Sequence, residues 1–102
     1  MITKRMLKTL KKLLKNTPKL YETEEKVNPL TPIHFFNILG RGDWYVTEAR
    51  EEKEDILFYG YCKSPLGEDC DEWGYFTLSQ LKNAKFIELD LFFKPQPIKG
   101  VI

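Results

Sequence analysis

Few residues in this chain could carry out acid–base or nucleophilic chemistry. His34 is the only histidine, and Cys62 and Cys70 are the only cysteines. A nucleophilic serine or cysteine needs a histidine or a similar base within hydrogen-bond reach. His34 stands inside an apolar run and far in sequence from both cysteines. We therefore expect a histidine packed in the sheet or at its edge, not a catalytic base.

The carboxylates give a second chemical possibility. A hydrolase could use a pair chosen from Glu48, Asp55, Glu72 and Asp90. No partner motif accompanies these acids, and the sequence does not fix the distances between them. The chain also lacks the close Cys or His pairs of a zinc site and the glycine-rich loop of a phosphate site. We predict that the protein is not an enzyme and uses no metal or other cofactor.

The tripeptide Arg41-Gly42-Asp43 has the sequence of an integrin-binding motif. Gly40 and Gly42 supply the positive-φ positions of a tight turn, and the Asp43 carboxylate can bond nearby backbone amides. We predict that residues 40–43 form the loop of a β-hairpin with no adhesive role. On this interpretation, we expect Asp43→Glu to leave stability and activity nearly unchanged.

The N-terminal segment is basic and amphipathic. Leucines and a methionine recur at helical spacing between Lys4 and Lys15, and the cationic side chains fall on the opposite arc. This pattern predicts a helix over residues 3–16 whose apolar face packs on the rest of the chain. The first twenty residues carry seven positive charges and no acid, whereas the remainder has a net charge of −6. Such an arc could lie along nucleic-acid phosphates through Lys4, Arg5, Lys8, Lys11, Lys12 and Lys15.

Beyond a polar connector, the chain shows strand patterns at 33–39, 44–50, 56–63, 73–77 and 86–93. Gly60 indicates a bulge or a close backbone approach. A short helix is expected after Thr77, and residues 94–102 form an extended tail. The predicted fold is α+β: one domain, 1–102, with a mainly antiparallel four- to five-stranded sheet, the N-terminal amphipathic helix and one short helix.

Aromatic side chains are abundant on the predicted strands and alternate onto both sheet faces. The N-terminal helix covers one face, so the other must be covered by the short helix, the tail or a partner. The candidate protein-binding residues are Trp44, Tyr45, Tyr59, Tyr61, Trp73 and Tyr75. No apolar run is long enough for a membrane span and no secretory signal is recognisable. We therefore expect a cytoplasmic protein with two free thiols and no membrane partner.

Several motifs occur in an order that resembles a known family. "HFFNI", "WYVTE", "LFYGY", "EWGYFTLSQL" and "IELDLFFKPQP" are similar to the pattern of the bacterial domain-of-unknown-function family 2958, from about Leu20 onward. The family usually carries Arg-Asp where this chain has Glu88-Leu89-Asp90, and the basic helix goes beyond the common pattern. Because its members are typical of plasmids, phages and integrated elements, the resemblance implies a bacterial accessory protein. It supplies no activity, cofactor or catalytic residue.

Two functions follow as expectations. The first is a non-catalytic accessory protein of a mobile genetic element that binds a protein partner, with inhibition of a host defence as one concrete form. The alternative is nucleic-acid binding through the basic helix. The sequence does not indicate the oligomeric state.

Overall fold

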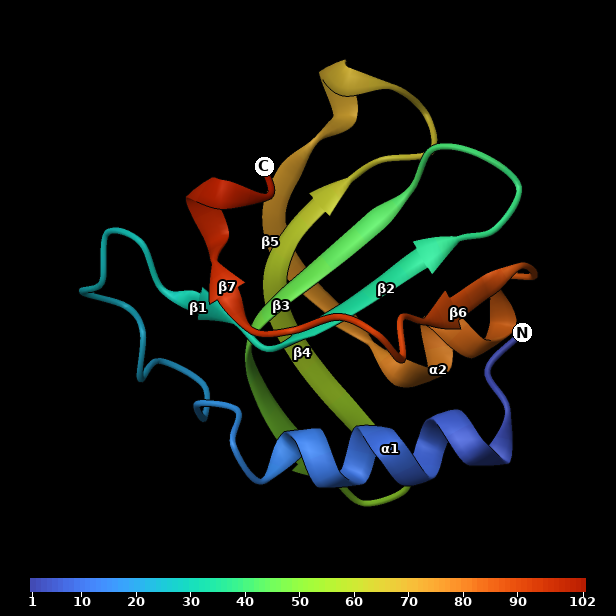
Figure 1. Cartoon of the computed structure of the whole chain (residues 1–102), viewed down its shortest axis with the longest axis horizontal. Coiled ribbons are helices and arrows are strands. Elements are labelled where there is room, and N and C mark those ends of the chain that lie inside the picture. Colours follow the sequence, from blue (N-terminus) through green and yellow to red (C-terminus); the bar gives the residue numbers. More distant parts are fainter.

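The computed structural model describes all 102 residues and is built around a five-stranded antiparallel sheet in the order β5-β4-β3-β2-β6 (Figure 1). Its strands are β2 (Ile33–Asn37), β3 (Asp43–Glu52), β4 (Asp55–Lys63), β5 (Glu72–Thr77) and β6 (Ile87–Leu89). A second sheet pairs β1 (Leu30–Thr31) with β7 (Gln96–Pro97). The helices are α1 (Lys4–Leu14) and α2 (Leu78–Asn83), and the short 3-10 turns are η1 (Glu68–Cys70) and η2 (Ile98–Gly100). The predicted α+β fold is confirmed.

The amphipathic helix α1 forms where its spacing predicts. The Thr3 hydroxyl accepts a hydrogen bond from the Met6 backbone amide at 3.1 Å and caps the first turn. Leu10 is only 1% exposed and belongs to the main apolar core, while the cationic side chains of α1 are exposed. The helix is therefore held by the burial of its leucine face.

One face of the large sheet carries the main core. Phe35, Val46, Phe58 and Phe76 come from four neighbouring strands, and α2 adds Leu78 and Leu81 to the same cluster. Thr77 caps α2 through its hydroxyl, with Gln80 at the position of the predicted capping box. Both helices thus cover this face, and the short helix does not cover the other one.

A β-bulge in β3 determines which face of the sheet Glu48 lies on. The pairing of β3 with β4 shifts between Val46 and Glu48, so Thr47 is the extra residue of a β-bulge. The bulge moves Glu48 off the core face and places it opposite Tyr59. Gly60 faces this point, where an added Cβ would lie 1.9 Å from the Tyr45 carbonyl oxygen. The close approach predicted at Gly60 is confirmed, and the bulge lies in the facing strand.

The second face is covered by the connector, defined here as residues 15–29, and by the C-terminal segment (Figure 1). Residues 94–102 are not simply an extended tail: β7 pairs with β1, and η2 follows with Ile98 buried. The predicted last strand, 86–93, is also too long, because β6 ends at Leu89. The chain turns away there, and the Asp90 side chain binds His34 at 2.9 Å.

Candidate functional site

Four aromatic side chains on β4 and β5 form a group that we call the aromatic cluster: Tyr59, Tyr61, Trp73 and Tyr75. Cross-strand pairing places Tyr59 opposite Tyr75 and Tyr61 opposite Trp73. The ring centroids of Tyr59 and Tyr75 lie 4.9 Å apart, and those of Tyr59 and Trp73 lie 5.8 Å apart. Trp73 is 39% exposed and Tyr75 52% exposed. The cluster therefore presents an aromatic surface at the edge of the sheet.

Beside this cluster, Glu48 fixes the connector to the sheet. One carboxylate oxygen accepts a hydrogen bond from the Tyr21 backbone amide at 2.8 Å. The other accepts from the Thr23 backbone amide at 2.9 Å and from the Thr23 hydroxyl. Glu48 is 3% exposed and takes part in none of the ion pairs of the structure. It is a buried carboxylate held by neutral donors.

A pocket of about 450 Å³ lies between the connector and the aromatic cluster. Its lining combines aromatic rings with a few charged groups: Tyr21, Thr23, Glu24, Lys26, Val27, Pro29, Glu48, Tyr59, Trp73 and Tyr75. Hydrogen bonding with the Tyr21 side chain, followed by desolvation, raises the pKa of Tyr75 above its usual value. Tyr21 and Tyr75 both line the pocket, and its lining combines four aromatic side chains with the Glu48 carboxylate.

The structure divides the six aromatic residues singled out in the sequence. Tyr59, Tyr61, Trp73 and Tyr75 are together, and Tyr45 lies opposite Tyr61 on the same sheet face, whereas Trp44 lies on the other face. Trp44 packs against the main core, and Tyr45 is buried in a stack with His34 at 4.6 Å between ring centroids. Adjacent residues of a strand point to opposite faces, so these two could not share one surface.

Sequence reasoning missed Tyr21 and Glu48 as parts of this pocket. Tyr21 lies in the connector, which has no periodic pattern to place it, and it has a positive φ of 73°. Glu48 is a buried acid within an otherwise uncharged stretch of β3. An acid at such a position was the one sequence signal that could have indicated a functional role. The bulge at Thr47, however, cannot be read from the alternation of residue types.

His34 is packed in the sheet, as expected, and is bound on both sides. Its Nε2 lies 2.7 Å from an Asp43 carboxylate oxygen and its Nδ1 lies 2.9 Å from one of Asp90. Tyr45 and Phe93 pack on the ring. The histidine therefore joins β2 to the start of β3 and to the segment after β6. The Asp43 carboxylate, which was expected to suit the turn, binds this ring.

The β2–β3 connection is a hairpin loop, as predicted, but it spans residues 38–42, and Asp43 is the first residue of β3. A positive φ was expected at both Gly40 and Gly42, and only Gly42 has one. Gly42 has a φ of +147°, and Arg41 makes a two-pronged ion pair with Asp71 at 2.6 and 2.7 Å. Arg41 also donates to the Ser64 carbonyl at 2.6 Å. Hydrogen bonding from Arg41 lowers the pKa of Asp71 to about 2. Both charged members of the tripeptide are thus engaged within the chain.

The remaining candidates for chemistry are dispersed. Asp55 binds the Ser79 amide at 3.0 Å and hydroxyl at 2.7 Å at the start of α2, whereas Glu72 is exposed. Cys62 and Cys70 are free, as predicted, and burial raises the pKa of Cys62 to about 11. No group of three or more His, Cys, Asp or Glu side chains is arranged to hold a metal ion. No helix is long and apolar enough to cross a membrane.

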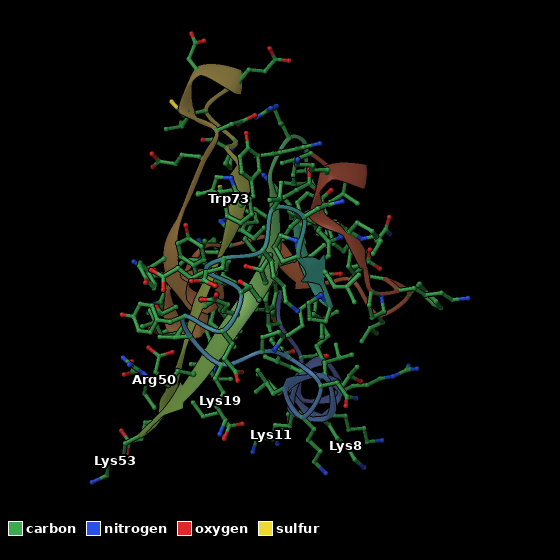
Figure 2. All side chains as sticks on the ribbon, turned by 90° about the vertical axis from the view of Figure 1, so that its left-hand side faces the viewer. Lys8, Lys11, Lys19, Arg50, Lys53 and Trp73 are labelled. Carbon is green, nitrogen blue, oxygen red and sulfur yellow. The ribbon has the colours of Figure 1, made fainter.

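Five basic side chains labelled in Figure 2 lie at the other end of the molecule from Trp73. Figure 2 shows Lys8 and Lys11 projecting from α1, with Lys19, Arg50 and Lys53 near the end of the β3–β4 hairpin. All six basic residues singled out in α1 and just after it are exposed: Lys4, Arg5, Lys8, Lys11, Lys12 and Lys15. A groove of about 640 Å³ is lined by Lys15, Lys19, Arg50 and Tyr21, among others. Tyr21 lines both this groove and the pocket.

Comparison with known proteins identifies the family. No curated protein and no solved structure matches the chain. A family model described as "Protein of unknown function (DUF2958)" matches residues 1–98. The match begins well before Leu20 and includes α1, which the sequence resemblance had left outside the common pattern. The chain therefore belongs to the DUF2958 family of proteins of unknown function.

Proposed function

We propose that this protein is a non-catalytic binding protein that takes up a protein partner at the aromatic cluster. The observation that supports this proposal is the partly exposed Trp73 and Tyr75 beside a pocket of about 450 Å³. Tyrosine and tryptophan bury a large area at a small entropic cost and dominate the energetics of protein interfaces. Much of the exposed aromatic surface of the sheet thus lies in one place.

The biological setting is also a proposal. Family resemblance motivates a bacterial cytoplasmic accessory protein encoded by a mobile genetic element. An inhibitor that blocks a host defence protein is the concrete form we favour. Its small size and the net charge of −6 on the chain after residue 20 suit a competitor for a basic surface.

Affinity capture from the bacterial host tests the binding function. The tagged protein is compared with Trp73→Ala/Tyr75→Ala, with nuclease present and absent. Phe92→Ala is the matched control, because Phe92 is 92% exposed and lies outside the pocket lining. We expect a protein partner that survives nuclease and is lost only from the double variant. Retention of the same partner by the double variant would contradict the proposal.

A second candidate function is nucleic-acid binding, and the basic groove favours it. Lys15, Lys19 and Arg50 converge there beside Tyr21, so phosphates and a stacked base could be held together. Loss of every captured partner on nuclease treatment would favour this alternative. Trp73 lies far from the labelled basic side chains in Figure 2. This separation argues against one continuous surface for a nucleic-acid strand.

A further inference from the structure

The pocket beside the aromatic cluster contains a negative charge that the chain itself does not neutralise by direct contact. Glu48 is 3% exposed, and its hydrogen-bond donors are two backbone amides and a hydroxyl. These donors satisfy the oxygens but carry no net positive charge. A buried carboxylate without a cationic partner keeps an attractive potential for cations, because the surrounding protein screens it less than water does.

The rings around the pocket favour the same kind of ligand. The faces of tyrosine and tryptophan rings attract cations through their quadrupole, and tryptophan does so most strongly. Tyr59, Trp73 and Tyr75 all line the pocket. The same sheet face already accommodates one cation in this way, since the Lys63 ammonium lies 5.8 Å from the centroid of the Tyr45 ring.

The charged lining residues have a net negative balance. Lys26 is the only basic residue of the lining, against Glu24 and Glu48. Lys26 forms no ion pair in the structure and is exposed. It is therefore a competing cation at the rim and not a fixed counter-ion of Glu48.

We infer that this pocket receives a basic side chain, an arginine or a lysine, presented by the protein partner. The inference rests on the proposed function and specifies the chemistry of the group that anchors the partner. The cation lies among the rings of Tyr59, Trp73 and Tyr75, with the Glu48 carboxylate beneath. A pocket of about 450 Å³ is large enough for one long side chain.

The test uses the intact protein and a small probe, Nα-acetyl-arginine amide. The probe is titrated while the indole N–H signals of both tryptophans are followed by NMR. Trp44 is an internal reference, because it packs against the core of the opposite face. The neutral isostere Nα-acetyl-citrulline amide is the matched ligand control. We expect arginine to shift the Trp73 signal selectively and citrulline to bind about tenfold more weakly. Equal affinities, or an unshifted Trp73, would overturn the inference.

Three variants sharpen the result. Trp73→Ala/Tyr75→Ala should abolish the arginine response, followed then through the amides of the connector. Lys26→Gln removes the competing cation and should tighten arginine binding about two- to threefold. Glu48→Gln should reduce the preference for arginine over citrulline. Because that change also disturbs the connector, the comparison of the two probes on the unaltered protein is decisive.

The outcomes separate this inference from the proposed function. If capture finds a partner that depends on Trp73 and Tyr75 while the arginine probe fails, the binding function stands and the cation inference falls. If the arginine probe binds as expected but the double variant still captures the partner, the proposed interface is wrong. The inference that the pocket binds a cationic side chain then still holds.

Discussion

Two acidic side chains of β3 hold segments that are remote in sequence. Asp43 binds His34, whose other ring nitrogen binds Asp90, and Glu48 binds the backbone of the connector at Tyr21 and Thr23. Every buried polar side-chain atom of the chain has a hydrogen-bond partner. At the scale of single residues, these two acids of β3 therefore hold irregular segments of the chain against the sheet through hydrogen bonds.

The first prediction concerns Glu48. Glu48→Gln replaces one acceptor oxygen by a donor that faces the Thr23 or Tyr21 amide, so a buried hydrogen bond is lost. We expect the free energy of unfolding to fall by about 1–3 kcal/mol. The measurement is urea unfolding followed by tryptophan fluorescence. Glu51→Gln, an exposed change on the same strand, is the control and should stay within about 0.5 kcal/mol. A similar loss of unfolding free energy in both variants would contradict the role of Glu48 in attaching the connector to the sheet.

The second prediction is a pH dependence at Asp71. Its pKa is about 2 in the folded protein against an ordinary value of 3.8, chiefly because Arg41 donates hydrogen bonds to it. The unfolded chain therefore binds more protons than the folded chain between these values, and stability falls as the pH falls. The contribution is fully present above the unfolded pKa and is lost as the pH drops toward 2.

Unfolding curves at several pH values check this dependence. Asp71→Asn should be less stable than the wild type at neutral pH, and the difference should shrink from pH 4 toward pH 2. The pKa of Asp55 is also lowered, chiefly by the Ser79 hydroxyl, so some acid sensitivity should remain in the variant. A stability difference that does not change with pH would show that the Arg41 pair contributes no proton linkage.

At the scale of elements, the sequence predicted the helices and strands that have a regular apolar spacing. It did not predict features that depend on contacts between residues far apart in the chain. The helix α1 and the strand pattern around Phe58 have regular apolar spacing, and both were placed correctly. The last strand was predicted to reach Phe93 because its residues alternate. The strand ends at Leu89 instead, and a turn follows in which the Asp90 carboxylate accepts a hydrogen bond from the Phe92 amide at 3.0 Å. Asp90 also binds His34, 56 positions away, and no local pattern predicts that contact.

The candidate site shows the same division. Its strands were identified from residue patterns, and Tyr59 and Trp73 belong to the six aromatic residues that were proposed together as a binding surface. The structure places Trp44 of that set on the other face. The pocket itself depends on the bulge at Thr47 and on a connector that folds back over the sheet. Only the three-dimensional arrangement reveals them.

The third prediction concerns the attachment of α1. Leu10 is 1% exposed in the main core, so Leu10→Ala leaves a cavity between α1 and the sheet. We expect a loss of about 2–5 kcal/mol in the free energy of unfolding. Thermal or urea unfolding measures it. Lys12→Ala changes an exposed position of the same helix and should be nearly neutral. Equal effects would mean that the helix is not held by its leucine face.

At the scale of the whole molecule, charge is distributed unevenly along the chain. The first twenty residues carry seven positive charges, and the rest of the chain has a net charge of −6. Figure 2 places the labelled cations around α1 and the β3–β4 hairpin, away from Trp73. Acids are also present near α1, because Glu51, Glu52, Glu54 and Asp55 line a hollow together with Lys11. The exposed lysines of α1 would nevertheless attract a nucleic acid, whereas the aromatic cluster lies elsewhere. The two proposed functions therefore use different ends of the protein.

The last prediction separates these two ends. Replacing Lys8, Lys11, Lys12 and Lys15 together by glutamine should hardly change stability, because all four are exposed and glutamine is a good helix former. Under the protein-binding proposal, capture of the partner should also persist, since none of the four lines the pocket.

Under the alternative, the unaltered protein binds nucleic acid with an affinity that falls steeply as salt rises. Removing four phosphate contacts would then flatten the slope of log affinity against log salt by about three to four units. Fluorescence anisotropy with labelled single- and double-stranded oligonucleotides over a range of salt measures this slope. We expect no salt-dependent binding in the micromolar range and unchanged partner capture. Micromolar binding that the glutamine variant loses, together with biological activity, would instead assign the function to the basic helix, because the aromatic cluster is identical in both proteins.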